Sequence, residues 1–211
     1  MTFSERISAL KDITLNSLPG EQAHSDLMPV NRPFSSQVKL NSDGFRQSAV
    51  AMVLYEDRGE LMSILIQRPT YQGVHSQQIA FPGGKRDPED PNIEFTARRE
   101  CMEEVAIPME ELSLLGRLTD VYIPVSKFIV SPHLFAIDSL PELIPDAREV
   151  DEIIPFKVSQ LLQADSIRYT DMKFGNGFKQ KDVPYFAIED KIVWGATGMI
   201  LSEFRAILSQ I

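Results

Sequence analysis

The stretch RRECMEEVAIP, Arg98 to Pro108, places three glutamates within five residues. Pro108 predicts the end of a helix, because proline lacks the N–H group that continues the helical hydrogen-bond ladder. A helix turns by about 100° per residue, so Glu100, Glu103 and Glu104 share an arc of about 100°. Like charges on one helix face destabilise the helix by a few tenths of a kcal/mol per pair. We therefore expect something at this face to compensate the three negative charges.

Two interpretations of this glutamate face are open. It is either a solvated charged surface, with Arg99 as an ion-pair partner, or a cage for Mg²⁺ or Mn²⁺, which prefer carboxylate oxygens. The upstream segment FPGG, Phe81 to Gly84, favours the cage. Two adjacent glycines let the backbone approach a metal or a phosphate closely, because no Cβ intervenes. If the face is a cage, the metal site would consist of Gly84, Glu100, Glu103 and Glu104.

Around this helix the sequence predicts a mixed arrangement of strands and helices. Residues 3–17 show helical spacing of apolar side chains, and residues 19–45 form an irregular arm that contains three prolines. Strands are predicted at 48–56 and 61–68, followed by a helix of about 14 residues with Asn92 as its N-cap. Further strands, a hairpin at 184–195 and a final helix follow. Since strands and helices do not alternate regularly, an α+β architecture is expected. We predict an arm at 1–44 and one domain at 45–211.

Composition argues against several classes of partner. The chain has 211 residues, a net charge of -9 and a pI of about 4.9. An acidic surface argues against non-specific binding to nucleic acid or to an anionic membrane. Cys101 is the only cysteine, so no intramolecular disulfide can form, and the cytoplasm is the expected location. Cys101 itself is expected to be a small buried residue.

The glycine turn followed by Arg-Glu-x-x-Glu-Glu resembles the signature of the Nudix hydrolase family, Gly-x5-Glu-x7-Arg-Glu-U-x-Glu-Glu-x-Gly-U, where U is bulky and aliphatic. Here the second half runs from Arg99 to Ile107, with Ala106 at the glycine position. Counting back from Arg99 puts the first glutamate at Pro91, next to Glu89 and Asp90. The resemblance implies an α/β/α sandwich, in which a mixed β-sheet is flanked by helices. It also implies Mg²⁺- or Mn²⁺-dependent hydrolysis of a nucleoside diphosphate linked to another group.

The segment ILIQRPTYQGVHSQQIAFPGG, Ile64 to Gly84, resembles the coenzyme A pyrophosphatase subgroup of that family. Arg68 and the FPGG turn match that subgroup in register, whereas its second arginine is missing, and His75 or Arg86 would take its place. The C-terminal VWGATGMIL, Val193 to Leu201, looks similar as well. The implied reaction is hydrolysis of the pyrophosphate of coenzyme A or acyl-CoA to 3′,5′-ADP and (acyl-)4′-phosphopantetheine.

The resemblance also assigns roles to individual residues. The predicted catalytic residues are Arg99, Glu100, Glu103 and Glu149, with Glu100, Glu149 and Glu152 as alternative general bases. The predicted substrate-binding residues are Arg68, His75, Phe81, Lys85 and Arg86. The expected partner is a small nucleotide, with no nucleic acid and no membrane.

Three questions stay open at this level. Dimers are common in the family, so a homodimer is one expectation, with the N-terminal helix and arm as an interface or a substrate lid. One alternative function is hydrolysis of another nucleoside diphosphate derivative such as ADP-ribose. The other is a non-catalytic Nudix-fold module that only binds nucleotides, which the displaced first glutamate and Ala106 motivate.

Overall fold

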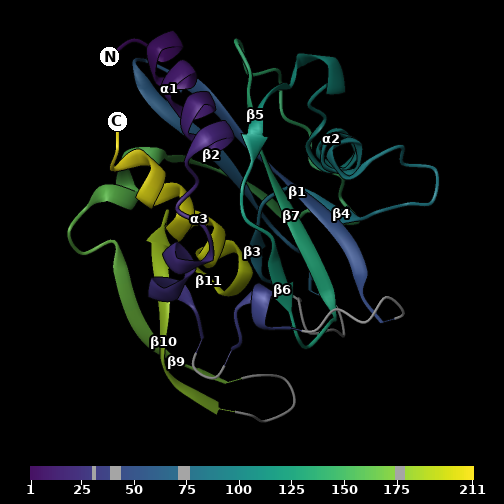
Figure 1. Cartoon of the computed structure of the whole chain (residues 1–211). Coiled ribbons are helices and arrows are strands. Elements are labelled where there is room, and N and C mark those ends of the chain that lie inside the picture. The colour runs from purple at the N-terminus through teal and green to yellow at the C-terminus, as the bar shows by residue number, and fades with distance from the viewer. Residues whose placement is uncertain (30–31, 39–43, 71–76, 174–178) are drawn as a thin grey trace.

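A mixed sheet forms the centre of the computed structural model, which describes residues 1–29, 32–38, 44–70, 77–173 and 179–211 (Figure 1). The sheet has eight strands in the order β3-β2-β1-β7-β5, with β4 beside β1, β6 beside β7 and β8 beside β2. The strands β1 and β7 are parallel, and the other pairs are antiparallel. The strands are β1 (Arg46–Asp57), β2 (Glu60–Gln67), β3 (Ile79–Ala80), β4 (Gly83–Lys85), β5 (Ser113–Arg117), β6 (Val121–Ile123), β7 (Phe128–Ala136) and β8 (Glu152–Lys157).

Helices cover both faces of this sheet. They are α1 (Phe3–Asn16), α2 (Ile93–Val105) and α3 (Gly195–Leu208), with short 3-10 helices η1 (Glu21–Leu27), η2 (Ser35–Gln37), η3 (Met109–Glu111) and η4 (Val158–Leu162). In Figure 1, α2 lies on one side of the sheet, and α1 and α3 lie on the other. The core therefore has two parts, and the predicted α+β sandwich with a mixed sheet is confirmed. Within the described residues, every helix is too short or too polar to cross a membrane.

The alternation of side chains along β1 explains the two core layers. Ala51 and Val53 point to the α2 side, where they pack with Ala97, Cys101 and Val105. The neighbouring residues of β1 point to the opposite side and pack among the apolar side chains of α1 and α3, which include Leu10, Ile13, Leu201, Phe204 and Ile207. Successive residues of a strand face opposite sides of a sheet, so an apolar run such as β1 serves both layers. Cys101 is fully buried, as expected.

A second, three-stranded antiparallel sheet lies beside α3. It consists of β9 (Ile167–Lys173), β10 (Lys179–Ile188) and β11 (Lys191–Trp194), in the order β11-β10-β9. The β10–β11 hairpin was predicted, and Ile188 pairs with Lys191 beside its turn. The strand β9 was not predicted, because its side chains are half-buried or exposed and its sequence lacks a continuous apolar pattern.

The N-terminal arm is tied to the last helix through a buried carboxylate. Glu203 of α3 accepts hydrogen bonds from the backbone N–H of Gly20 (3.2 Å) and from both the N–H (2.9 Å) and the hydroxyl (2.7 Å) of Thr119. The His24 Nε2 lies 3.3 Å from the same carboxylate. Burial raises the pKa of Glu203, but the hydrogen bonds from His24 and Thr119 outweigh burial and bring it below its ordinary value. The arm is therefore anchored at η1, while the boundary at 44–45 stays a prediction.

Ala106, which stands at the glycine position of the signature, ends α2 in the left-handed conformation, with φ 61° and ψ 28°. A side chain in this conformation costs about 1 kcal/mol relative to glycine. We expect Ala106→Gly to raise the free energy of unfolding in urea by about 0.5–1 kcal/mol. The matched control is Ala206→Gly, inside α3, where glycine is expected to lower it by about 1 kcal/mol. A decrease of similar size at both positions would contradict this account of the helix end.

Candidate active site

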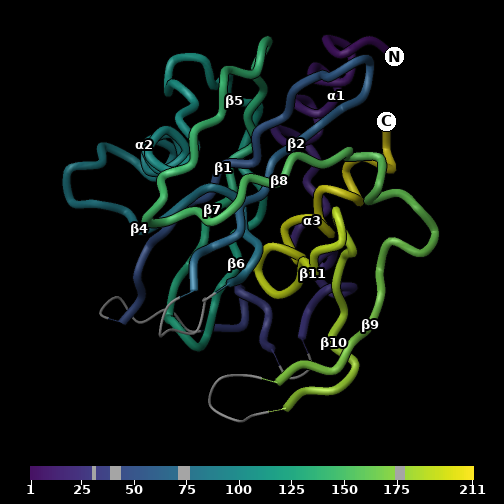
Figure 2. The backbone as a smooth tube through the Cα atoms, turned by 180° about the vertical axis from the view of Figure 1, so that it is seen from behind, coloured from purple at the N-terminus to yellow at the C-terminus, as the bar shows by residue number. Residues whose placement is uncertain are grey.

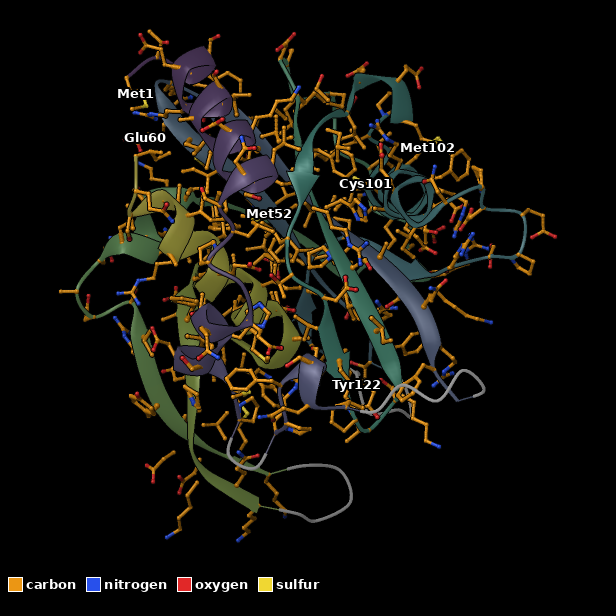
Figure 3. The ribbon with its side chains drawn as sticks, viewed as in Figure 1. Met1, Met52, Glu60, Cys101, Met102 and Tyr122 are labelled. Carbon is orange, nitrogen blue, oxygen red and sulfur yellow. The ribbon has the colours of Figure 1, made fainter. Side chains whose placement is uncertain are left out.

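The helix α2 carries the predicted acidic residues on the side that meets β4. Asn92 caps the helix as predicted, because its side chain accepts a hydrogen bond from the Phe95 N–H at 2.8 Å. Figure 3 shows Cys101 pointing from α2 toward the sheet, whereas Met102, its neighbour in sequence, points away. Glu100 and Glu104 are buried, and Glu103 is exposed. The helix therefore presents two of these three glutamates to the interior rather than to solvent.

Three carboxylates meet at this position. One oxygen each from Glu100, Glu104 and Glu149 lie within 4.8 Å of one another. Glu149 was predicted as a catalytic residue, and Glu103 was predicted as a metal ligand. The residue that completes this close group is Glu149, not Glu103. The exposed Glu103 instead accepts a hydrogen bond from Arg99 Nη1 at 2.9 Å, and its predicted contact with a metal stays a prediction.

The loop that carries Glu149 is fixed to the C-terminal end of α2. The Ile144 N–H donates to the Val105 carbonyl (3.3 Å), and the Asp146 N–H donates to the Glu104 carbonyl (3.0 Å). The last carbonyls of a helix have no partner within the helix, so this loop satisfies two of them. Figure 2 shows the segment between β7 and β8 passing beside α2. The loop therefore brings Glu149 back to the helix that supplies the other two carboxylates.

Arg99 organises the acidic residues around it. Its Nε and Nη2 donate to the two oxygens of Asp90 at 3.0 Å each, and its Nη1 donates to Glu100 Oε1 at 2.9 Å. Thr96 Oγ1 also donates to Asp90, at 2.8 Å. The hydrogen bonds from Arg99 lower the pKa of Asp90 to about 2, and Asp90 in turn raises the pKa of Arg99. A bidentate guanidinium–carboxylate pair is rigid, so Arg99 holds Glu100 in a fixed position.

Asp90 is the acidic residue near the displaced first-glutamate position that contacts Arg99. It is buried and bound to Arg99, whereas Glu89 is exposed. Counting back from Arg99 gave Pro91 instead of Asp90, because the loop before the helix is one residue longer than in the general signature. Counting forward from Gly84 would have given Asp90, since five residues separate the two, as in Gly-x5-Glu.

The two glycines of the FPGG turn form the opposite wall of the group. The Gly83 N–H donates to Glu104 Oε2 at 2.7 Å. A Cβ atom at Gly84 would lie 2.4 Å from the carboxylate carbon of Glu100, closer than real contacts allow. The absence of a Cβ atom at Gly84 therefore lets the Glu100 carboxylate lie against the backbone, and the predicted approach of this backbone to a metal or a phosphate stays a prediction.

The electrostatics of the group favour a cation. Burial raises the pKa of Glu104 to about 8, and burial also raises the pKa of Glu100. Glu104 Oε1 is buried without a hydrogen-bond partner in the described part of the chain, and Arg68 Nη1 lies 4.0 Å from it. A divalent cation favours ionised carboxylates, and Mg²⁺ and Mn²⁺ take oxygen ligands. The residues present therefore fit a hard divalent cation.

The remaining predicted residues lie at different distances from the carboxylates. Arg68 faces Glu104, and Lys85 is exposed on β4. Arg86 donates to the side-chain oxygen of Gln47 (2.9 Å) and to the Asp90 carbonyl (3.2 Å). Phe81 is buried in the core, and Glu152, the alternative base, pairs with Lys191. His75 lies outside the described residues.

Comparison with known proteins gives a consistent result. The NUDIX domain model matches residues 45–174. A Homo sapiens protein named mitochondrial coenzyme A diphosphatase NUDT8 is 36% identical over 130 residues, which cover 61% of this chain and 54% of that protein. The matched segment thus spans about half the length of this relative. A Photorhabdus laumondii protein named uncharacterized Nudix hydrolase NudL is 30% identical over 166 residues, covering 78% of this chain and 86% of that protein.

Solved structures share the fold. A C. elegans Ap4A hydrolase in a binary complex superposes with a TM-score of 0.53 and covers 79% of this chain and 99% of its own. Its sequence identity is 16%, so this likeness concerns the fold alone.

Proposed function

We propose, since this chain belongs to the Nudix hydrolase family, that its substrate is coenzyme A or an acyl derivative and that its products are 3′,5′-ADP and the corresponding 4′-phosphopantetheine. The observation that carries the hydrolytic part is the group formed by Glu100, Glu104 and Glu149, whose oxygens lie within 4.8 Å of one another. The similarity to a coenzyme A diphosphatase and the segment that contains Arg68 support the choice of substrate.

Glu100 and Glu104 would hold Mg²⁺ or Mn²⁺, with the Gly84 backbone beside them, and Glu149 would stay free to accept a proton. When bound, such an ion offsets charge that develops on the phosphate oxygens and lowers the pKa of a bound water. Arg68 Nη1 lies 4.0 Å from Glu104 Oε1, and Arg68 would bind a diphosphate oxygen as a charge-assisted hydrogen-bond donor. Arg99 is a positioning residue, because its contacts are to Asp90, Glu100, Glu103 and the Lys85 carbonyl.

Glu149 is the proposed general base. It is exposed, whereas Glu100 and Glu104 are buried, so it is the member of the group that solvent reaches. In the proposed reaction, water attacks one phosphorus atom of the diphosphate and gives a proton to Glu149. The bond between that phosphorus and the bridging oxygen breaks, and the other phosphate leaves with the bridging oxygen. A carboxylate base of this kind contributes about 10²–10⁴-fold to a rate.

A panel of substrates scored by product identity tests the choice of substrate. The purified protein is incubated with Mn²⁺ and, separately, with coenzyme A, acetyl-CoA, ADP-ribose or diadenosine tetraphosphate. Coenzyme A or its acetyl derivative is expected to give the highest kcat/KM, with 3′,5′-ADP as a product. Faster cleavage of ADP-ribose without release of 3′,5′-ADP from coenzyme A would reject the substrate and keep the family chemistry. Tight binding of nucleotides without turnover of any substrate would instead support a binding module.

A further inference from the structure

The loop between β7 and β8, which carries the proposed general base, is attached to both elements that supply the other residues of the site. Near its start, the Asp146 N–H donates to the carbonyl of Glu104 in α2 at 3.0 Å. At its end, the Asp151 N–H donates to the carbonyl of Gln67 at 2.9 Å, and Gln67 directly precedes Arg68. The loop therefore joins the end of α2, with its proposed cation ligands, to the end of β2, with its proposed diphosphate-binding arginine.

Apolar side chains fix both ends of this loop, whereas the base itself is exposed. Leu143 packs against the core on the α2 side of the sheet, and Val150 is buried in that core. Glu149 directly precedes Val150 and is exposed to solvent. The position of its carboxylate therefore depends on the conformation of the short turn between these two apolar anchors.

Asp146 holds this turn through both its backbone and its side chain. Its carbonyl accepts hydrogen bonds from the N–H groups of Glu149 (3.0 Å) and Val150 (2.8 Å). Its Oδ1 accepts hydrogen bonds from the Arg148 N–H (2.8 Å) and Nε (3.1 Å), and its Oδ2 accepts one from Arg148 Nη2 (2.7 Å). Aspartate is favoured at the first position of a turn, because its side chain can accept the N–H two residues later. Two hydrogen bonds in series therefore link the backbone of Glu104 to that of Glu149 through Asp146.

We propose that Asp146 is a positioning residue, which holds the base Glu149 beside the two buried carboxylates of α2. This inference rests on the proposed function and adds the residue that keeps its base in place. Among the described residues, the Asp146 side chain bonds only with Arg148, so its removal leaves the turn without side-chain support. A displacement of about 1 Å in an active site can cost about 10²-fold in rate, so a small change in this turn is enough to weaken the base.

A double-mutant cycle of Asp146→Ala and Glu149→Gln tests this role on whichever substrate of the panel is cleaved fastest. Asp146→Ala is expected to lower kcat about 10-fold and to leave KM and the Mn²⁺ concentration for half-maximal rate within about 2-fold, because only the base is displaced. Glu149→Gln is expected to lower kcat by at least about 100-fold. The double variant should be at most about 2-fold slower than Glu149→Gln, because a base that is absent cannot be displaced. Losses that multiply, or a loss that appears in KM instead of kcat, would overturn the inference.

Two further variants serve as controls for the cycle. Asp146→Asn keeps a side-chain oxygen that can accept the Arg148 N–H, so its kcat should stay within about 3-fold of the wild type. Asp165→Ala removes another exposed aspartate that pairs with an arginine, since Arg168 Nη2 lies 3.3 Å from its Oδ2, and it should leave kcat unchanged. Equal losses in Asp146→Asn and Asp146→Ala would show that the turn is not what the Asp146 side chain supports.

Amide hydrogen exchange followed by NMR separates the positioning role from the reaction, because it needs no substrate. In Asp146→Ala the amides of Glu149 and Val150 should exchange at least about 10-fold faster than in the wild type, while the amides of α2 keep their rates. If this result is found but coenzyme A is not cleaved, the positioning of the loop stands and the proposed function fails. If coenzyme A is cleaved but these amides exchange as in the wild type, the function stands and the positioning role is rejected.

Discussion

Replacing Glu104 with glutamine is expected to lower kcat for diphosphate hydrolysis by about a thousandfold, which corresponds to about 4 kcal/mol. Glu104 is buried, one of its oxygens is held by the Gly83 N–H, and the other has no hydrogen-bond partner among the described residues. Glutamine keeps the shape and removes the negative charge. The loss should therefore come from weaker cation binding, and the measurement is the initial rate at saturating substrate over a range of Mn²⁺ concentrations.

The control for this substitution is Glu110→Gln, an exposed glutamate of η3 that has no role in the proposed site. Its rate should stay within about 2-fold of the wild type, since surface substitutions rarely have larger effects. The melting temperature of Glu104→Gln should not fall, because burial disfavours an ionised carboxylate and glutamine carries no charge. If Glu104→Gln turned over substrate as fast as Glu110→Gln, the carboxylate group would not be the active site.

Gly84→Ala is expected to lower kcat/KM by about a hundredfold without unfolding the protein. The added Cβ would lie 2.4 Å from the carboxylate carbon of Glu100. This carboxylate is the end of a flexible side chain, so it can move away at little cost to the fold. The movement displaces it from Glu149 and Glu104, and a displacement of about 1 Å in an active site can cost about 10²-fold in rate. The measurement is kcat/KM together with a thermal melt.

Gly44→Ala is the matched control, because a Cβ at Gly44 would meet no atom of the described residues within 4 Å. It should leave kcat/KM unchanged. A Gly84→Ala variant with wild-type activity would show that the close approach of Gly84 to Glu100 has no role in the reaction. A loss of activity that came with a large fall in melting temperature would point to the fold instead.

Local patterns were sufficient for the parts of the site that lie on one continuous segment. The spacing in Arg98 to Pro108 predicted the helix, and the prolines and glycines around it predicted the turns. Buried and exposed positions of α2 were harder to predict, because periodicity gives an arc and not the direction in which a neighbouring element lies. Glu103 shares that arc with Glu100 and Glu104, yet it is exposed and bonds with Arg99.

Parts of the site that depend on distant segments could not be fixed from the sequence. Glu149 reaches Glu100 because the loop before it caps the carbonyls of Glu104 and Val105, and no local pattern predicts that contact. The role of Asp90 became clear only through its bidentate contact with Arg99.

The most direct measurement is mass spectrometry of the products that the wild-type protein forms from coenzyme A and Mn²⁺ in isotopically labelled water, with Glu104→Gln in parallel. The account predicts 3′,5′-ADP and 4′-phosphopantetheine from the wild type, with one labelled oxygen on one of the two new phosphates, and almost no product from the variant. Intact coenzyme A after prolonged incubation with the wild type, or equal amounts of labelled product from both proteins, would contradict it.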